Sequence, residues 1–178
     1  MNKSIPELDV STPIKRRHHM PFGAEFIAED AVRFQMWAPA ARHIRLLIDN
    51  NAPLPMQANG GGWYERICQP IQTGSRYCFQ INDDIRVPDP ASRYNPDDVH
   101  GASQLINPAT FDWCDDEWYG RPWEEAVIYE IHTGTFTPQG TFSAIEQKLE
   151  YLTSLGVTAI ELMPVADFPG RCNWGYDG

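Results

Sequence analysis

The sequence predicts two architectures in succession, an antiparallel β-sandwich and then one βαβ unit of a parallel α/β domain. Two patterns support this prediction. Residues 22–107 contain short runs in which apolar and polar residues alternate, which is the period of half-buried strands. Residues 126–178 contain an apolar run, a segment with helical spacing and a second apolar run, the order of a βαβ unit.

Residues 1–21 show no sustained apolar period and are expected to form a flexible N-terminal arm. Their basic cluster, Lys15 to His19, is interpreted as a solvated lead-in. The formal net charge of −10 argues against nucleic acid as a partner, because phosphate binding needs a basic patch. No stretch approaches the ~20 apolar residues of a membrane span, and no secretory leader is recognisable. We therefore expect a soluble, cytoplasmic protein without a membrane partner.

The cysteines and histidines predict neither a metal site nor a cofactor. The four cysteines form no Cys-x-x-Cys pair, and the five histidines have no ligand spacing. Reduced thiols are the expectation. Cys68 and Cys78 could face each other across neighbouring strands, and the sequence leaves that pairing open.

The predicted sandwich alternates over three clear runs separated by turns at Ala38–Arg42 and Asn59–Gly62. The inward positions of these runs form the predicted core: Phe34, Met36, Leu46, Ile48, Phe79 and Ile81. Residues 87–107 lose the alternation, and three prolines disfavour a helix there, so this stretch is expected to be an ordered loop.

Residues 108–125 form a predicted connector rich in tryptophan. Trp113, Trp118 and Trp123 stand among acidic residues. We interpret these indoles as sealing a domain interface, with a sugar-stacking platform as the alternative.

The predicted βαβ unit begins with a strand over Ala126–His132 and ends with a strand over Val157–Val165, expected to be covered on both faces. Between them, apolar residues recur every three or four positions and predict one helix: Phe142, Ile145, Leu149, Leu152 and Leu155. Ser143 with Glu146 fits a capping box, and Gly156 is placed to end the helix. One βαβ unit cannot close a barrel, so we expect it to open a larger domain, with its site in the loop after the second strand.

Five short motifs carry a family resemblance. VIYEIHTGTF (127–136), GVTAIELMPV (156–165) and NWGYDG (173–178) resemble the first strand, second strand and following loop of the catalytic barrel of the α-amylase superfamily of glycoside hydrolases. PDPASRY (88–94) and VHGASQ (99–104) narrow the resemblance to the malto-oligosyltrehalose trehalohydrolase family. It implies an all-β early-set-like sandwich, similar to the N-terminal domain of glycogen branching enzymes, followed by the first βαβ unit of a truncated (β/α)8 TIM barrel.

The resemblance implies a retaining glycosidase that hydrolyses the α-1,4 glucosidic bond of maltooligosyl trehalose and releases trehalose, as in trehalose biosynthesis. The partner would be that substrate or another α-glucan. The family's catalytic carboxylates follow later barrel strands that this chain lacks, so no catalytic residue is carried over. Retaining cleavage needs two carboxyl groups about 5 to 5.5 Å apart. We expect this chain alone to be inactive.

The resemblance implies substrate contact at the end of the chain. Tyr176 is expected to stack on the sugar, and Trp174 and Asp177 either touch sugar or shape the loop. His132, after the first strand, could line the pocket or bond to neighbouring backbone, and both alternatives stay open. Asp167 has no predicted partner.

Glu130 and Glu161 fall inside the two predicted strands rather than at their ends. They are interpreted as satisfied polar groups of the barrel wall.

Two other functions remain open. One is a glycogen branching or debranching enzyme, which shares the barrel motifs. The other is a non-catalytic glucan-binding module, for which Trp37, Trp63 and Tyr64 are the aromatic residues to inspect. A nucleotide-binding protein is disfavoured, because no Gly-x-Gly-x-x-Gly follows a strand. The sequence does not predict an oligomeric state.

Overall fold

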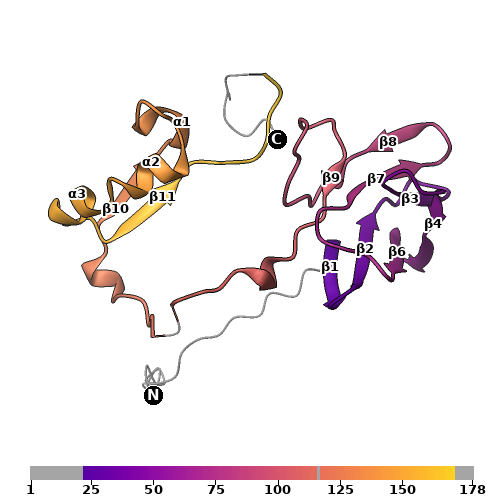
Figure 1. The fold of residues 1–178 in the computed structure, drawn as a ribbon, viewed down its shortest axis with the longest axis horizontal. Coiled ribbons are helices and arrows are strands. Elements are labelled where there is room, and N and C mark those ends of the chain that lie inside the picture. Colours follow the sequence, from indigo (N-terminus) through magenta and orange to yellow (C-terminus); the bar gives the residue numbers. More distant parts are fainter. Residues whose placement is uncertain (1–21, 116, 171–178) are drawn as a thin grey trace, which may run out of the picture. The chain divides into compact units, whose positions relative to one another are not determined.

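The computed structural model describes residues 22–115 and 117–170. These residues form two compact units, one built mainly from residues 22–112 and the other mainly from residues 113–166. Figure 1 shows the first unit in indigo to magenta and the second in orange to yellow. Each unit is described separately below.

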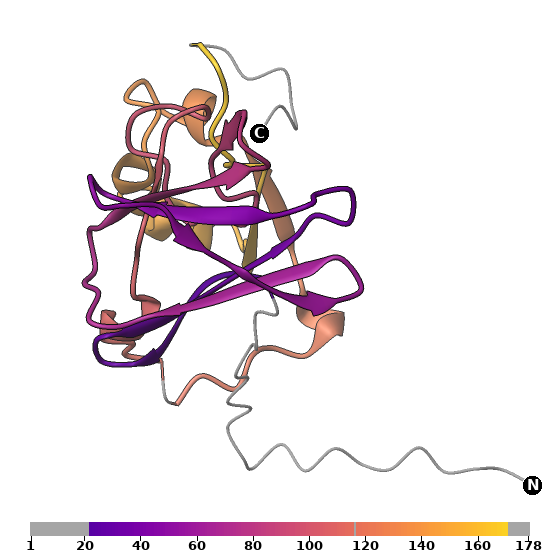
Figure 2. The same ribbon diagram turned by 90° about the vertical axis from the view of Figure 1, so that its right-hand side faces the viewer.

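The first unit contains two antiparallel sheets (Figures 1 and 2). One has four strands in the order β1 (Gly23–Ala28), β2 (Ala31–Trp37), β6 (Trp63–Cys68) and β5 (Gln57–Gly60). The other has the order β4 (Leu54–Pro55), β3 (Ile44–Ile48), β7 (Arg76–Ile81) and β8 (Ile85–Val87), and β9 (Ser103–Gln104) also pairs with β7. Short strands with alternating burial pack as two layers, as the sequence predicts.

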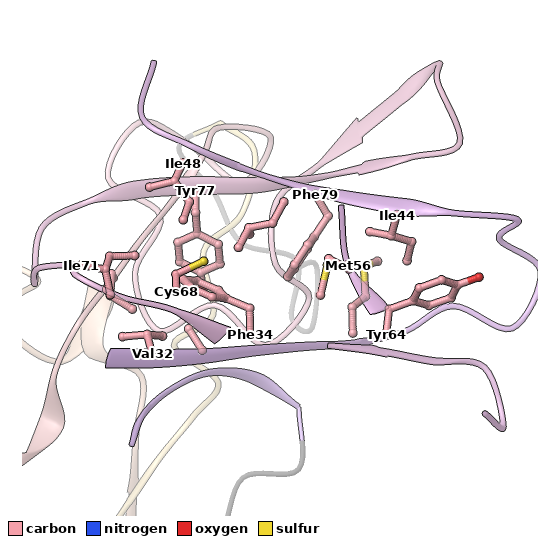
Figure 3. Close-up of a cluster of buried hydrophobic side chains, with 14 residues drawn as sticks. Val32, Phe34, Ile44, Ile48, Met56, Tyr64, Cys68, Ile71, Tyr77 and Phe79 are labelled. Carbon is pink, nitrogen blue, oxygen red and sulfur yellow. The ribbon is translucent and has the colours of Figure 1, made fainter. Parts of the chain in front are cut away.

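The core lies between these two sheets (Figure 3). Phe34, Leu46 and Phe79 are fully buried, and the ring of Phe34 meets that of Tyr77 edge-on at 5.0 Å between centroids. Five of the six predicted core residues are buried, while Ile81 packs against the cluster half-buried. The predicted antiparallel sandwich and its core are therefore confirmed.

The two cysteines whose pairing the sequence left open are separate thiols. Cys68, on β6 of the four-stranded sheet, faces the core between the two sheets. Cys78, on β7 of the other sheet, alternates with the buried Tyr77 and Phe79 and therefore faces outward. Burial raises the pKa of both thiols. Fewer thiolate ions lower their reactivity.

The connector contains two short 3-10 helices, η1 (Pro108–Thr110) and η2 (Trp123–Glu125). Trp113, Trp118 and Trp123 are all exposed within the described residues. Their role as an interface seal stays a prediction.

The second unit is a βαβ unit whose two strands are parallel (Figure 1). Its elements are β10 (Ile128–Ile131), α1 (Thr133–Phe136), α2 (Phe142–Glu146), α3 (Leu149–Ser154) and β11 (Ala159–Leu162). Ile131, Ile145 and Leu152 form its small core between strands and helices.

The helical segment differs from the prediction. Instead of one helix there are two, because Lys148 N donates to the carbonyl of Ile145 at 2.8 Å, three residues back, and the chain tightens out of α-helical geometry. Of the five predicted face residues, only Ile145 and Leu152 are buried; Phe142, Leu149 and Leu155 are exposed.

The predicted capping box at Ser143 is wrong. Thr141 is the N-cap: its backbone is extended, and its hydroxyl accepts a hydrogen bond from Ala144 N at 3.3 Å. Ser143 is already inside α2. A threonine two residues earlier satisfies the first free N–H groups, so the serine is not needed as a cap.

The predicted helix end at Gly156 is confirmed. Gly156 has φ +87°, its N–H donates to Thr153 O at 2.9 Å, and Val157 N–H donates to Leu152 O at 3.1 Å. This is the Schellman pattern, and Val157 also packs on the cluster that contains Leu152.

The second strand is shorter than predicted and is not covered on both faces by the described residues. Helices lie over one side, where Ile131 is buried and Ile160 packs. On the other side, Ile128 and Ala159 are exposed. Within the described unit, one face of the two-stranded sheet is open.

Candidate functional site

The carboxyl ends of β10 and β11 are where the sequence predicts a site. Three of the predicted contacts, Trp174, Tyr176 and Asp177, lie outside the described residues. The fourth predicted substrate contact, His132, lies within the described residues.

His132 follows β10 directly and starts α1. Its carbonyl accepts hydrogen bonds from Thr135 N at 3.1 Å and Phe136 N at 3.0 Å. Its ring lies over Gly134, where an added Cβ would be 3.2 Å from His132 Cε1. The small residue at 134 thus leaves room for the imidazole beside the strand end.

The imidazole Nδ1 is buried and has no hydrogen-bond partner among the described residues. The alternative in which Nδ1 bonds to neighbouring backbone is not found in this part of the chain. An unpaired buried ring nitrogen is costly, so a group from elsewhere is expected to satisfy it.

Glu130 and Glu161 are direct partners in the parallel ladder. They lie on the strand face opposite Ile131 and Ile160, both are exposed, and neither has a hydrogen bond or ion pair among the described residues. Their interpretation as satisfied polar groups of a barrel wall therefore stays a prediction, because the described unit contains only two parallel strands.

Asp167 lies after β11 and is exposed. Among the described residues it has no ion-pair partner, and no group of three or more histidine, cysteine, aspartate or glutamate residues could hold a metal. Nothing in the described residues supplies a closely spaced carboxyl pair at the strand ends. No catalytic residue is assigned.

A buried polar network explains two motifs that sequence reasoning did not assign a role. In PDPASRY, Asp89 Oδ2 accepts from the Tyr77 hydroxyl at 2.8 Å, and Oδ1 accepts from Ala91 N at 2.8 Å. In VHGASQ, Ser103 Oγ accepts from Asp89 N at 3.0 Å. Burial raises the pKa of Asp89 despite these bonds. Both motifs therefore anchor the loop after β8 to the sandwich. The sequence feature that could have indicated this role is an aspartate between two prolines, Pro88 and Pro90.

The three aromatic residues that the sequence marked for inspection separate into two kinds. Tyr64 is buried, and its hydroxyl donates to Ala41 O at 2.7 Å, so it belongs to the core. Trp37 and Trp63 are direct cross-strand partners, and Trp37 is 58% exposed. These two indoles are available on the outside of the sandwich.

Comparison with known proteins covers both units. Residues 21–91 match the model of carbohydrate-binding module 48, the isoamylase N-terminal domain. The chain is 46% identical over 159 residues to the malto-oligosyltrehalose trehalohydrolase of Saccharolobus solfataricus, which covers 89% of this chain and 28% of that protein. The chain thus spans about a quarter of the length of the curated relatives it matches.

A solved structure from Salmonella typhimurium, provisionally named an alpha amylase, superposes with a TM-score of 0.84 at 47% identity, covering 90% of this chain and 27% of the other. The 1,4-alpha-glucan branching enzyme of Xanthomonas campestris pv. campestris is more distant, at 32% identity over 82% of this chain and 23% of its own length. In the described part of the chain, no helix is both long and apolar enough to cross a membrane.

Proposed function

Because the chain belongs to the malto-oligosyltrehalose trehalohydrolase family of α-amylase-like glycoside hydrolases, we propose that it is part of an enzyme that hydrolyses the α-1,4 glucosidic bond of maltooligosyl trehalose and releases trehalose. The observation that carries this proposal is the 46% identity to a trehalohydrolase across 89% of the chain, which includes residues of both units. The substrate is proposed from the names of the relatives.

The βαβ unit is proposed to be the first of a (β/α)8 barrel, in a chain divided into a sandwich over residues 22–107, a connector over 108–125 and the barrel from residue 126. Parallel β10 and β11, with helices on one side and an open face on the other, support this assignment. In such a barrel the open face points inward, and the unpartnered Glu130 and Glu161 would meet side chains of other strands.

The proposed roles of this chain in catalysis concern binding rather than bond cleavage. Tyr176 would stack on the sugar at the cleavage position, with Trp174 and Asp177 beside it. The buried, unpaired Nδ1 of His132 at the end of β10 supports a pocket-lining role, because a sugar hydroxyl could satisfy it. The two carboxyl groups of a retaining mechanism would come from strands outside this chain.

A branching enzyme is the second candidate, since such an enzyme is also a relative of this chain. Its identity of 32%, against 46% for the trehalohydrolase, favours hydrolysis with release of trehalose. The two activities differ in product: a branching enzyme transfers a glucan to form a new linkage, whereas a trehalohydrolase frees trehalose.

The test is a chimera in which this chain replaces the matching segment of the Saccharolobus solfataricus trehalohydrolase. Maltotriosyl trehalose is the substrate, and released trehalose is quantified by chromatography. We expect the chimera to release trehalose and its His132→Ala variant to have a raised KM, with the unmodified relative as the reference for full activity.

Three outcomes count against the proposal. A folded chimera that releases no trehalose would show that this segment does not support the reaction. A chimera that forms branched products instead would favour the second candidate. Unchanged kinetics for His132→Ala would remove His132 from the pocket.

A further inference from the structure

Arg66 is a charged residue on the inner face of the sandwich. It lies in β6 directly opposite Phe34 of β2, and the residues two positions before and after it, Tyr64 and Cys68, both belong to the core. Alternate residues of a strand share a face, so Arg66 also points toward the space between the two sheets. Its side chain is half-buried. A guanidinium in such a place needs polar partners, because a charge removed from water is costly.

The described residues satisfy this guanidinium only in part. Its Nη1–H donates to the carbonyl of Pro55 at 3.4 Å, which is longer than an ordinary hydrogen bond. Its Nε is buried and has no hydrogen-bond partner in residues 22–115 and 117–170. Within the same ranges, no carboxylate forms an ion pair with Arg66. Its positive charge is therefore available to a ligand.

Arg66 and Cys68 line a cavity of about 530 Å³ at one end of the sandwich, here termed the Arg66 cavity. Its walls come from the ends of β3, β4 and β6 and from the segment between β6 and β7. Figure 3 shows Cys68, Ile48 and Ile71 at this end of the core and Tyr64 at the other. The volume is within the range of small-molecule sites.

The guanidinium also acts on the thiol in this cavity. Burial raises the pKa of the Cys68 thiol, and the positive charge of Arg66 opposes that rise by a smaller amount. The arginine side chain therefore lies close to Cys68. This makes the thiol a natural reporter of whatever binds beside Arg66.

The walls of the Arg66 cavity combine apolar and neutral polar groups. Ile48, Leu54 and Ile71 supply apolar lining. Gln72 and Ser75 supply polar lining, and their side chains have no hydrogen bond recorded among the described residues. Such a mixture fits a ligand that has an apolar body and one polar end.

The charges around the cavity favour a ligand with a single negative charge. Besides Arg66, the lining contains Asp49, whose Oδ1 accepts a hydrogen bond from Arg76 N at 2.8 Å. The guanidinium attracts an anion, whereas the carboxylate opposes one that carries several charges. A phosphate group has a charge of nearly −2 at neutral pH. A monocarboxylate has a charge of −1 and offers two oxygens to the guanidinium fork.

We propose that the Arg66 cavity binds a small monocarboxylate that has an apolar ring or chain. The carboxylate accepts hydrogen bonds from the Arg66 guanidinium, and the apolar part lies against Ile48, Leu54 and Ile71. This proposal is independent of the proposed function, because the cavity belongs to the first unit and includes no residue of β10 or β11. A ligand there contacts strands of both sheets and so stabilises the folded sandwich.

The test is a titration of this chain with benzoate, followed by NMR of the Arg66 Nε–H signal and of the backbone amides. Benzamide is the matched ligand control, because it has nearly the same shape and no charge. Benzoate should bind at least about tenfold more tightly than benzamide. Inorganic phosphate is the third ligand and should bind more weakly than benzoate. Benzoate should also raise the melting temperature of the parent chain.

Arg66→Gln should weaken benzoate binding by about tenfold or more, because it removes the charge and the paired donors. Arg66→Lys should have an intermediate effect, since it keeps the charge without the planar fork. Arg86→Gln is the matched control. It removes the same charge from an exposed position of β8 that does not line the cavity, and it should bind benzoate as the parent does.

Asp49→Asn should change the affinity in the opposite direction. Removing the carboxylate from the cavity lining should tighten benzoate binding severalfold, because one repelling charge is lost. Asparagine tolerates the positive φ of +48° at this position, and its side-chain oxygen can still accept from Arg76 N. This variant gives a reading even if Arg66→Gln does not fold.

Alkylation of the cysteines gives a second measurement in the same molecule. Saturating benzoate should slow the reaction of Cys68 with iodoacetamide, measured by mass spectrometry of peptides, because the ligand occupies the cavity that Cys68 lines. Cys114 is exposed and does not line the cavity, so its rate should not change.

Circular dichroism and the melting temperature of each variant show whether it is folded. A parent chain that does not bind benzoate would overturn the proposal, as would equal affinities for benzoate and benzamide. Equal benzoate affinities of folded Arg66→Gln and Arg86→Gln, or weaker binding by Asp49→Asn, would also overturn it. Tighter binding of phosphate than of benzoate would overturn the choice of a monocarboxylate. Trehalose release by the chimera tests the proposed function alone, so the two proposals can fail separately.

Discussion

The hydroxyl of Tyr77 donates a hydrogen bond of 2.8 Å to Oδ2 of Asp89, and both residues are buried. Tyr77 lies in β7, and Asp89 lies in the loop after β8. The bond therefore ties a proline-rich loop to the core of the sandwich at a point from which water is excluded. Because a buried carboxylate without a donor is costly, both partners should matter for stability.

Tyr77→Phe should destabilise the sandwich by about 1 to 3 kcal/mol, because the ring still packs but Asp89 loses a donor. Urea denaturation followed by circular dichroism measures the change. Tyr94→Phe is the control, since Tyr94 is exposed and its ring hydroxyl has no recorded partner in the described residues. Equal stabilities of the two variants would contradict this account.

Asp89 should make the sandwich less stable as pH rises. Burial raises its pKa, so between its ordinary value of about 4 and the raised value the folded chain binds more protons than the unfolded chain. The stability that Asp89 contributes is thus fully present below about pH 4 and is lost as the pH rises through the pKa of Asp89 in the folded chain. Asp89→Asn cannot titrate, so the stability advantage of the parent over this variant should shrink with pH.

Urea denaturation of both proteins at several pH values gives that difference directly. Taking the difference cancels the contributions of carboxylates that are common to both proteins and stabilise the fold as pH rises. Asp83 is one of these, because hydrogen bonds from Arg45 and His43 lower its pKa. A difference that grows with pH would show that the sign is wrong.

Phe34→Ala should cost about 3 to 5 kcal/mol, because it leaves a cavity between the two sheets where Phe34 meets Tyr77. Ile27→Ala is the matched control on the neighbouring strand β1, where the side chain is half exposed. Ile27→Ala should lower the free energy of unfolding by well under half as much as Phe34→Ala does. Similar unfolding midpoints for the two variants would argue against Phe34 as a central core residue.

Gly156→Ala should destabilise the second unit by about 1 to 2 kcal/mol, because Ala pays a conformational penalty at φ +87°. No atom lies within 4 Å of an added Cβ, so backbone strain is the only expected cause. Gly156→Asn should be milder, since asparagine tolerates this conformation better. Hydrogen exchange of amides in α3 and β11 measures the effect, and faster exchange in Gly156→Asn than in Gly156→Ala would contradict it.

Tyr176→Ala in the chimera should lower kcat/KM at least severalfold without lowering the melting temperature, if the ring stacks on sugar as proposed. Tyr176→Phe should be milder because it keeps the aromatic face. A large fall in melting temperature with normal kcat/KM for the folded fraction would instead indicate a core role. The chain alone should release no trehalose, because its described residues supply no closely spaced carboxyl pair at the strand ends.

The sequence by itself determined the local features of this protein. The two-residue period identified the strands around Phe34, Leu46 and Phe79, because successive side chains of a strand point to opposite faces. Gly156 was identifiable as a helix end, because a positive φ strongly favours glycine there. Both features depend on residues within a few positions of each other.

The tertiary structure decided which distant residues meet. Strand order put Cys68 and Cys78 on different sheets, and register put Trp37 opposite Trp63 and Gln35 opposite Glu65. The burial of Asp89 against Tyr77 likewise depends on how a loop folds back over a sheet. Such contacts join segments whose separation in the chain carries no periodic signal, so only the packing of complete sheets selects them.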